Sequence, residues 1–228
     1  MRQVRAVCLD LDDTLWELGP VLRRADEDFH RWLGERYPRV AMRYPVASLQ
    51  ALRQAIADEF PDRRHDLGAL RRELYARLAR EAGYGGTMVD EAFAEFQRLR
   101  NRVTPFADVV PALERIGRVH TLVALTNGNA DLDVIGLAGH FRATFTAAAI
   151  GAAKPDPRVF AAVCDHLGLP PAAVVHAGND PENDVLAPAR LGMPAVWVNR
   201  TASDWPARGV YPDHTVRDLV HLADLLGC

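Results

Sequence analysis

The chain of 228 residues can form one large or two small domains, and its content of 49% hydrophobic and 7% aromatic residues is typical of a globular protein. Its formal charge of -3 argues against nucleic acid or an anionic membrane surface as the main partner. The three cysteines are widely separated and predict neither disulfides nor zinc, and no run of about 20 apolar residues predicts a membrane span. We therefore expect a cytoplasmic protein, and the sequence leaves its oligomeric state open.

The first predicted element is a buried strand over residues 4–9, which ends in the segment Asp10-Leu11-Asp12-Asp13-Thr14. Asp10 and Asp12 point to the same side of an extended segment, whereas Asp13 points away, so we expect Asp13 to belong to a turn. Neighbouring carboxylates repel one another, and a hard cation such as Mg²⁺ relieves the repulsion. This segment therefore predicts a metal and phosphate site.

The pattern then turns helical, with apolar residues at helical spacing in four stretches around residues 22–33, 49–60, 67–78 and 92–99. Breaks are expected at Pro38, Pro45, Pro61 and residues 83–86. Thr87 and Asp90 resemble a capping box that opens the last helix. Residues 17–102 are therefore predicted to form a helical bundle inserted after the first strand.

After Thr104-Pro105, strands and helices alternate. Strands are predicted at residues 121–125, around 145, at 173–176, at 195–198 and from 214 onward, and helices at 108–116, 131–137, 157–167 and 181–191, with a loop over 201–212. This alternation is typical of an α/β fold with a Rossmann-like, doubly wound parallel sheet covered by helices on both faces. The predicted sheet domain comprises residues 1–16 and 103–228.

Four polar segments each follow a predicted strand: residues 10–14, 126–129, 154–155 and 178–184. The strand ends of a doubly wound sheet converge on one crevice, so these segments are expected to meet there. Lys154 is the single lysine beside 26 arginines, which indicates a position that requires a compact ammonium group. Carboxylates, a hydroxyl, a lysine and an amide-rich turn together predict phosphoryl transfer.

Each predicted catalytic residue meets one need of that reaction. Asp10 is the predicted nucleophile, which forms an aspartyl-phosphate. Asp12 is the predicted acid that protonates the leaving group and then the base that activates water. Lys154, Thr126 and the neighbouring Asn127 are the predicted phosphate-binding residues, and Mg²⁺ offsets the repulsion between Asp10 and the phosphate.

This set of segments resembles the haloacid dehalogenase superfamily. Residues 10–14 look like its first motif, Thr126 its second, Lys154 its third and residues 178–184 its fourth, all in the same order. The resemblance implies that the helical insertion is a mobile cap domain and that Asp10, Asp12, Asn179 and Asp184 form the metal site. Residues 9–16 and 125–130 also look like bacterial phosphatases that act on FMN or on the phosphoribitylamino-uracil intermediate of riboflavin synthesis, which implies a small phosphorylated metabolite as substrate.

The fourth motif departs from the family pattern, which usually begins Gly-Asp, because Asn179 stands at the position of that aspartate. An amide oxygen still binds Mg²⁺ but brings no charge, so the affinity for the metal should fall. Asp180 is an alternative ligand. However, Asp180-Pro181 also has the pattern of a helix N-cap followed by proline, which suffices to explain it.

Other readings stay open at this point. A dehalogenase needs the nucleophilic aspartate but neither the acid Asp12 nor a metal, and a sugar-phosphate mutase returns the phosphate to a sugar. A phosphonate-cleaving enzyme is disfavoured because Lys154 already has a phosphate role. A non-catalytic phosphate-binding module is suggested only by Asn179. His176, on a predicted buried strand, is expected to be structural.

Overall fold

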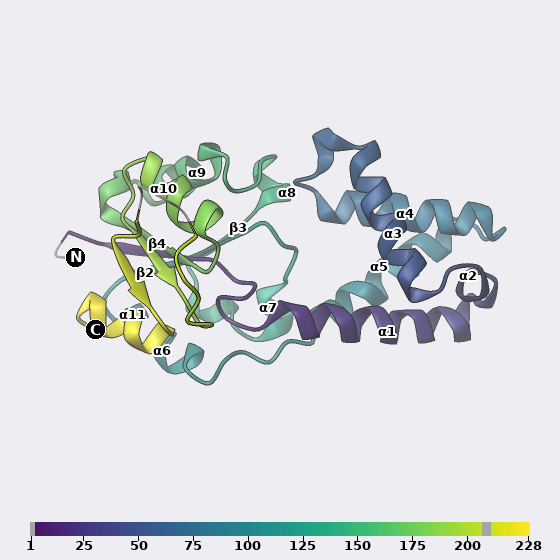
Figure 1. Ribbon diagram of the computed structural model, residues 1–228, viewed down its shortest axis with the longest axis horizontal. Coiled ribbons are helices and arrows are strands. Elements are labelled where there is room, and N and C mark those ends of the chain that lie inside the picture. The colour runs from purple at the N-terminus through teal and green to yellow at the C-terminus, as the bar shows by residue number, and fades with distance from the viewer. Residues whose placement is uncertain (1–2, 207–210) are drawn as a thin grey trace. The chain divides into compact units, whose positions relative to one another are not determined.

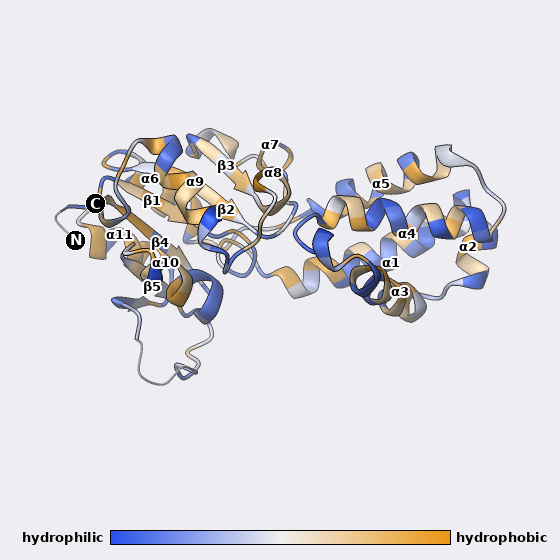
Figure 2. Ribbon diagram, turned by 90° about the horizontal axis from the view of Figure 1, so that it is seen from above, coloured by the Kyte–Doolittle hydropathy of each residue, from blue (hydrophilic) through white to orange (hydrophobic). Residues whose placement is uncertain are grey.

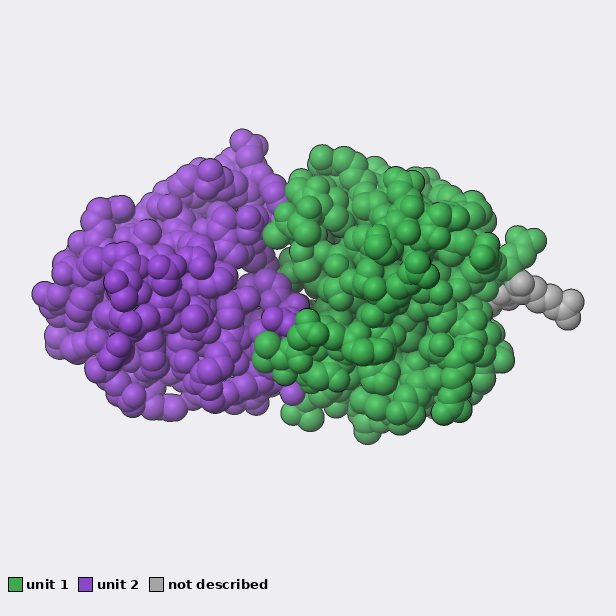
Figure 3. Space-filling model, turned by 180° about the vertical axis from the view of Figure 1, so that it is seen from behind, with its two compact units in different colours: residues 1–17, 104–128, 132–228 green, residues 18–103, 129–131 purple. Residues whose placement is uncertain are grey.

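The computed structural model describes residues 3–206 and 211–228, so part of the predicted loop over 201–212 lies outside the described residues. The chain divides into two compact units (Figure 3). The sheet unit comprises residues 1–17, 104–128 and 132–228, and the helical unit comprises residues 18–103 and 129–131. In the described part of the chain, no helix combines the length and the apolar composition that crossing a membrane requires.

The sheet unit is built on six parallel strands in the order β3-β2-β1-β4-β5-β6. Their bounds are β1 Ala6–Leu9, β2 Thr121–Thr126, β3 Ala143–Thr146, β4 Val174–Gly178, β5 Ala195–Val198 and β6 His214–Val216. Ala6 and Cys8 of β1 pack in one apolar cluster with Val159 and Val163, so alternation along the strand turns Val7 and Leu9 to the opposite face. All four residues of β1 are buried, as expected for a central parallel strand.

Helices cover both faces of this sheet, with α9 and α10 on one side and α6 and α11 on the other (Figure 1). The helices are α6 Val109–Gly117, α7 Leu132–Ile135, η2 Ala138–His140, α8 Ala147–Ile150, α9 Pro157–Leu167, η3 Pro171–Ala173, η4 Pro181–Leu186, α10 Ala187–Arg190 and α11 Leu219–Leu226. The predicted α/β fold with a parallel, Rossmann-like sheet is confirmed. One detail was wrong: the predicted helix over 181–191 is a π-helical turn, η4, followed by the short helix α10.

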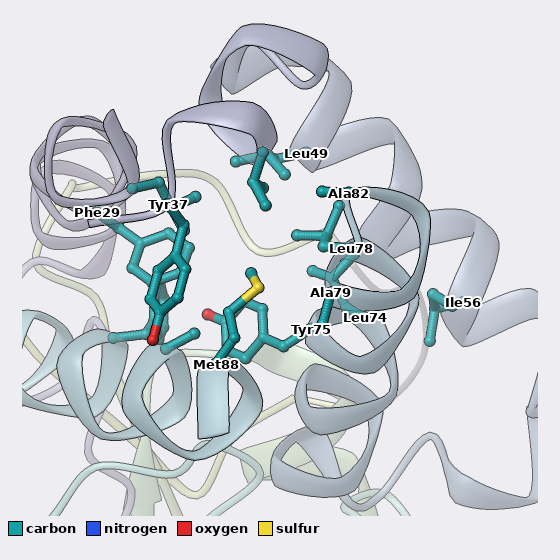
Figure 4. Close-up of a cluster of buried hydrophobic side chains, with 14 of the residues drawn as sticks. Phe29, Tyr37, Leu49, Ile56, Leu74, Tyr75, Leu78, Ala79, Ala82 and Met88 are labelled. Atoms are coloured by element: carbon teal, nitrogen blue, oxygen red, sulfur yellow. The ribbon is translucent and has the colours of Figure 1, made fainter. Parts of the chain in front are cut away.

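The helical unit contains α1 Leu18–Arg36, α2 Pro38–Arg43, α3 Val46–Glu59, η1 Pro61–Arg63, α4 Leu67–Glu81 and α5 Gly86–Arg100. Figure 2 shows hydrophilic and hydrophobic residues alternating along α1, α4 and α5, as in amphipathic helices. Their apolar sides form a core of their own, in which Phe29, Tyr75 and Met88 lie together (Figure 4). The unit therefore has the separate apolar cluster that an independent domain requires.

Of two local predictions for the helical unit, one was confirmed and one was wrong. The predicted break at Pro38 is present, because α1 ends at Arg36 and Pro38 begins α2, where its missing N–H leaves no bond unmade. The predicted capping box is absent, because Gly85 is the N-cap of α5 and makes no side-chain bond to the helix. The Asp90 carboxylate instead accepts a hydrogen bond from Arg72.

Candidate active site

Asp10 lies directly after β1, at the carboxyl edge of the sheet. Its N–H donates to the carbonyl oxygen of Ala177 at 3.0 Å, which extends the pairing of β1 with β4. The Thr14 hydroxyl lies 3.0 Å from Asp10 Oδ2 and 3.2 Å from Asn179 Oδ1, and its single proton can serve one acceptor at a time. The hydroxyl therefore brings the first and fourth predicted motifs together.

Lys154 connects Asp10 to Asp184 in the interior of the sheet unit. Its Nζ donates to Asp10 Oδ1 at 2.7 Å, to Asp184 Oδ1 at 2.6 Å and to the carbonyl oxygen of Leu125 at 3.2 Å. The Lys154 residue is only 5% exposed, so these three acceptors replace the water around the ammonium. A guanidinium is larger and planar, which explains why lysine is used at this one position.

Asp184 reaches this network from η4 and is almost completely buried. Besides Lys154, its Oδ1 accepts from His176 Nε2 at 3.0 Å, and its Oδ2 accepts from the Asp180 N–H at 2.9 Å. A Cβ atom at Gly178 would lie 2.4 Å from the Asp184 carboxyl carbon. A side chain at Gly178 is therefore incompatible with the observed place of this carboxylate.

The charges of the network explain the direction of its pKa shifts. Burial raises the pKa of Asp10 to about 7, against the opposing attraction of the Lys154 ammonium. Burial also acts to raise the pKa of Asp184, but Lys154 and the hydrogen bond from His176 outweigh it and hold that pKa below its usual range. Burial acts to lower the pKa of Lys154, but the two carboxylates raise it overall.

His176 is fully buried on β4, and burial lowers its pKa, so the ring is neutral at physiological pH. The contact with Asp184 assigns the ring proton to Nε2, because a carboxylate cannot donate. Within the described residues, Nδ1 has no hydrogen-bond partner. His176 thus supports Asp184 without adding a charge.

The second motif supplies Thr126 and Asn127 at the end of β2. The Thr126 hydroxyl accepts a hydrogen bond from the Gly128 N–H at 2.8 Å. The Asn127 amide pairs with the Lys154 backbone at both ends, since Nδ2 donates to the carbonyl at 2.9 Å and Oδ1 accepts from the N–H at 2.7 Å. Asn127 therefore positions the Lys154 loop, and the phosphate contacts of both side chains stay a prediction.

Asp12 and Asp13 lie in the turn that follows Asp10. The Asp12 Oδ1 accepts from Trp16 Nε1 at 2.8 Å, and Trp16 is fully buried, so its indole fixes one orientation of this half-buried carboxylate. Asp13 is exposed and has a φ of 61°, in the left-handed region that aspartate tolerates in turns. This agrees with the expected turn role of Asp13.

The fourth motif begins with Asn179 and Asp180. The Asp180 carboxylate accepts from the Asn183 N–H at 2.8 Å, which confirms the predicted N-cap. The Asn179 carbonyl accepts from Trp197 Nε1 at 2.8 Å. Asn179 also lines a hollow of about 650 Å³ in the sheet unit, together with Asp13, Trp197 and Arg200. The motif therefore borders a space large enough for a small metabolite.

The donor chemistry around Thr14 fits a magnesium ion that keeps most of its waters. Asp10 Oδ2 and Asn179 Oδ1 are hard oxygen donors beside one hydroxyl, and Mg²⁺ is commonly held by one or two carboxylates. Among residues 3–206 and 211–228, no three histidine, cysteine or acidic side chains lie together as a metal site. The ligand roles of Asp10, Asp12, Asn179 and Asp184 therefore stay a prediction.

Thr14 was predicted as part of the first segment of the site, but its contact with Asn179 was not. Two other contributors to the site were not identified as such from the sequence. His176 was expected to be structural, and it is buried, but nothing in the sequence pairs it with Asp184. No local signal connects Trp197 with Asn179, because their contact depends on the pairing of β4 with β5.

Comparison with known proteins gives consistent results. The family model described as haloacid dehalogenase-like hydrolase matches residues 4–192. The 5-amino-6-(5-phospho-D-ribitylamino)uracil phosphatase YigB of Escherichia coli is 27% identical, covering 98% of this chain and 97% of its own length. The phosphoserine phosphatase of Thermus thermophilus is 31% identical over 86% of this chain and 89% of its own.

A solved structure described as 2-haloacid dehalogenase from Pseudomonas syringae pv. Tomato superposes with a TM-score of 0.91. It shares 34% sequence identity, with 98% of each chain covered. The relatives thus include proteins named for phosphate ester hydrolysis and one named for dehalogenation. The matched model, the relatives and the four motifs on one sheet edge agree that the chain belongs to the haloacid dehalogenase-like hydrolase family.

Proposed function

We propose that the chain is a Mg²⁺-dependent phosphatase that hydrolyses a small phosphomonoester through an aspartyl-phosphate. The observation that carries the proposal is the buried group of Asp10, Lys154 and Asp184 at the carboxyl edge of the sheet, with Asp12 two residues after Asp10. One lysine faces two carboxylates there. This arrangement places the proposed nucleophile next to a cation whose charge can stabilise phosphate oxygens.

In the proposed first step, one Asp10 oxygen attacks phosphorus and the bond to the leaving alkoxide breaks. Asp10 Oδ1 is occupied by the Lys154 ammonium, whereas Oδ2 faces the Thr14 hydroxyl, whose proton can also serve Asn179. The Lys154 ammonium, whose three protons are already engaged, would stabilise the phosphate oxygens through its charge, and the Thr126 hydroxyl would donate to one of them as negative charge moves onto them.

Asp12 is the proposed proton carrier. In its acid form it gives a proton to the leaving alkoxide, and as carboxylate it then takes a proton from the water that cleaves the aspartyl-phosphate. The hydrogen bond from Trp16 engages one Asp12 oxygen, and the second oxygen is the one proposed for this exchange. The indole thus orients the acid without supplying a proton itself.

Asp10, Asp12 and Asn179 are the proposed protein contacts of Mg²⁺, which when bound neutralises the charge that would otherwise keep the phosphate away from Asp10. Asp184 already accepts three hydrogen bonds through its two oxygens. We therefore assign Asp184 the role of positioning Lys154, in place of direct metal ligation. The uncharged Asn179 should leave the affinity for Mg²⁺ lower than a carboxylate would.

For the substrate, we propose a phosphorylated flavin-pathway metabolite, either FMN or the phosphoribitylamino-uracil intermediate. The relative named for that uracil phosphatase supports this choice, because it aligns over nearly the whole chain. We further propose that the helical unit acts as the cap that selects the substrate. Because another relative is named phosphoserine phosphatase, a phosphorylated amino acid is also tested as a substrate.

The test is phosphate release from a panel containing FMN, the uracil intermediate, phosphoserine and sugar phosphates. Each is assayed with Mg²⁺ and with chelator, for wild type and Asp10→Asn. We expect activity that requires both the metal and Asp10, with a flavin-pathway compound as the best substrate. A preference for sugar phosphates would refute the substrate proposal alone, whereas metal-independent turnover would refute the magnesium role.

The second candidate function is dehalogenation of a 2-haloacid. It is favoured by the 34% identity to the structure described as a 2-haloacid dehalogenase and by the replacement of a motif carboxylate with Asn179. A halide needs no protonation when it leaves, so this reaction gives Asp12 no role. Halide release from 2-chloropropionate in the presence of chelator, with retention of activity in Asp12→Asn, would support it.

A further inference from the structure

A second hollow lies at the amino edge of the sheet, where β1, β2 and β3 begin. Its volume is about 460 Å³, and its lining includes Arg5, His120 and Arg142. Arg5 immediately precedes β1, whereas Asp10 immediately follows it. At about 3.3 Å per residue, these two ends of the strand lie roughly 16 Å apart, so a ligand here would not overlap the catalytic residues.

The charge of this hollow is entirely positive. Arg5, Arg118 and Arg142 line it together with His120 and His140, and none of its lining residues is acidic. Within residues 3–206 and 211–228, these three arginines form no ion pair, whereas arginines such as Arg53 and Arg200 contact carboxylates within 3 Å. Three unpaired guanidinium groups in one concave surface indicate a site for an anion.

His120 also lines the hollow. Both of its ring nitrogens are buried, and neither has a hydrogen-bond partner among the described residues. Because solvent does not reach these two nitrogens, they do not face the hollow, and the anion contacts of the hollow come from the arginines alone. Phe141 and Leu122 add apolar surface to the same wall.

We propose that this amino-edge hollow binds a small molecule that carries a diphosphate group. Arginine forks match phosphate oxygens in geometry, and three of them balance the charge of a diphosphate better than that of a monophosphate. The volume is in the range of small-molecule sites, which leaves space for an organic group against Phe141. The proposal does not depend on which bond the catalytic edge cleaves.

The test is calorimetric titration of the full chain with pyrophosphate in chelator, at low and high salt. The pocket variant carries R5Q, R118Q and R142Q. The control carries R158Q, R190Q and R217Q, which remove three exposed, carboxylate-paired arginines of the same unit. We expect one binding site in wild type and control, with at least tenfold weaker binding in the pocket variant and in high salt.

A second measurement keeps the proposal testable if the pocket variant does not fold. Phenylglyoxal modifies accessible arginines, and mass spectrometry of peptides identifies them. In wild type, pyrophosphate should protect Arg5, Arg118 and Arg142 but not Arg158 or Arg217. Equal affinity of the two triple variants, protection confined to other arginines, or loss of all binding in Asp10→Asn would overturn the proposal.

Discussion

Lys154 is the residue on which the charge balance of the catalytic edge depends. It lies between two buried carboxylates, and His176 beside them is neutral because burial lowers its pKa. Removal of the ammonium would leave Asp10 and Asp184 as like charges in the interior, where repulsion is screened weakly. The site is therefore stable only as a unit of lysine and carboxylates.

Lys154→Met should accordingly destabilise the chain by about 3–5 kcal/mol, the usual cost of breaking a buried ion pair, and abolish hydrolysis. The double variant Lys154→Met/Asp184→Asn should recover part of the stability, because Asp184→Asn removes one of the two uncompensated carboxylate charges. It should recover none of the activity, because the ammonium is still absent. Urea unfolding followed by circular dichroism measures both. A single variant within about 1 kcal/mol of wild type would show that Lys154 is not the stabilising cation.

Asn179 gives a prediction for the metal. Asn179→Asp should tighten Mg²⁺ binding by about tenfold, because a carboxylate brings charge to the position that shares the Thr14 hydroxyl with Asp10. Asn183→Asp is the matched control, since it adds the same charge in η4 without that contact. Activity is titrated against free Mg²⁺ for all three proteins. If both variants bound Mg²⁺ more tightly by the same factor, the added negative charge alone would explain the effect, and position 179 would not be a metal contact.

The sequence predicted that Asp10, Asp12, Lys154 and Asn179 lie at one edge of the sheet, because each follows a strand and parallel strands bring their ends together, and their catalytic roles stay predictions. It did not identify the partners that orient them. The phosphate role of Asn127 stays a prediction, and the contact of its amide with the Lys154 backbone was not predicted. A side chain that pairs with a distant backbone leaves no local pattern, so such roles are visible only in the fold.

At the scale of elements, the end of β4 must approach η4 closely. Gly178→Ala should destabilise the chain by about 2 kcal/mol or more and reduce activity, because the added methyl group overlaps the Asp184 carboxylate. Gly85→Ala is the control, since a Cβ there meets nothing within 4 Å. Thermal unfolding and kcat report the two effects. Full activity of Gly178→Ala would mean that Asp184 need not occupy this place.

Asp108 joins three elements of the sheet unit. It is the N-cap residue of α6, accepts two hydrogen bonds from Arg200 after β5 at 3.0 and 2.8 Å, and accepts the Leu219 N–H of α11 at 2.9 Å. Burial acts to raise the pKa of Asp108, but the bonds from Arg200 and Leu219 outweigh it and lower the pKa. The ionised form is therefore the one that the fold stabilises.

Asp108→Asn should lower the free energy of unfolding by about 1–3 kcal/mol at pH 7, because the charge-assisted hydrogen bonds to Asp108 are lost. A carboxylate whose pKa is lower in the folded than in the unfolded state stabilises the fold at pH values above the unfolded pKa of about 3.9. This stabilisation is lost as the pH falls below that value. The difference between wild type and variant should hence be constant from pH 7 to about 5 and shrink below about 4. A difference that grows on acidification would contradict the assignment.

The elements themselves were predictable to different degrees. The strands β1, β2, β4 and β5 contain short apolar runs, and β5 was predicted with the bounds that it has. The break at Pro38 was predicted, but the helix α2 that begins there was not, because its six residues are too few to show a helical period. The π-helical turn η4 has no periodicity of its own, and the Asp180 cap and the packing of Asp184 determine it.

At the scale of the whole molecule, the sheet unit contains all four motifs and the helical unit contains a separate apolar core. The sequence showed this division through the change from helical spacing to alternating strands and helices. It could not show the substrate, because substrate choice depends on side chains brought together by folding. Proteins named for phosphatase and dehalogenase activities share this fold, so the fold alone does not distinguish the two reactions.

The most direct test of the central claim is the identity of the covalent adduct on Asp10. The chain is mixed separately with FMN and with 2-chloropropionate, quenched in acid within one turnover and digested, and the peptide containing Asp10 is examined by mass spectrometry. We predict a phosphoryl group on Asp10 with FMN or another phosphomonoester and no adduct with the haloacid. An Asp10 esterified by the haloacid, with no phosphoryl adduct from any phosphomonoester, would contradict the account and establish the dehalogenase alternative.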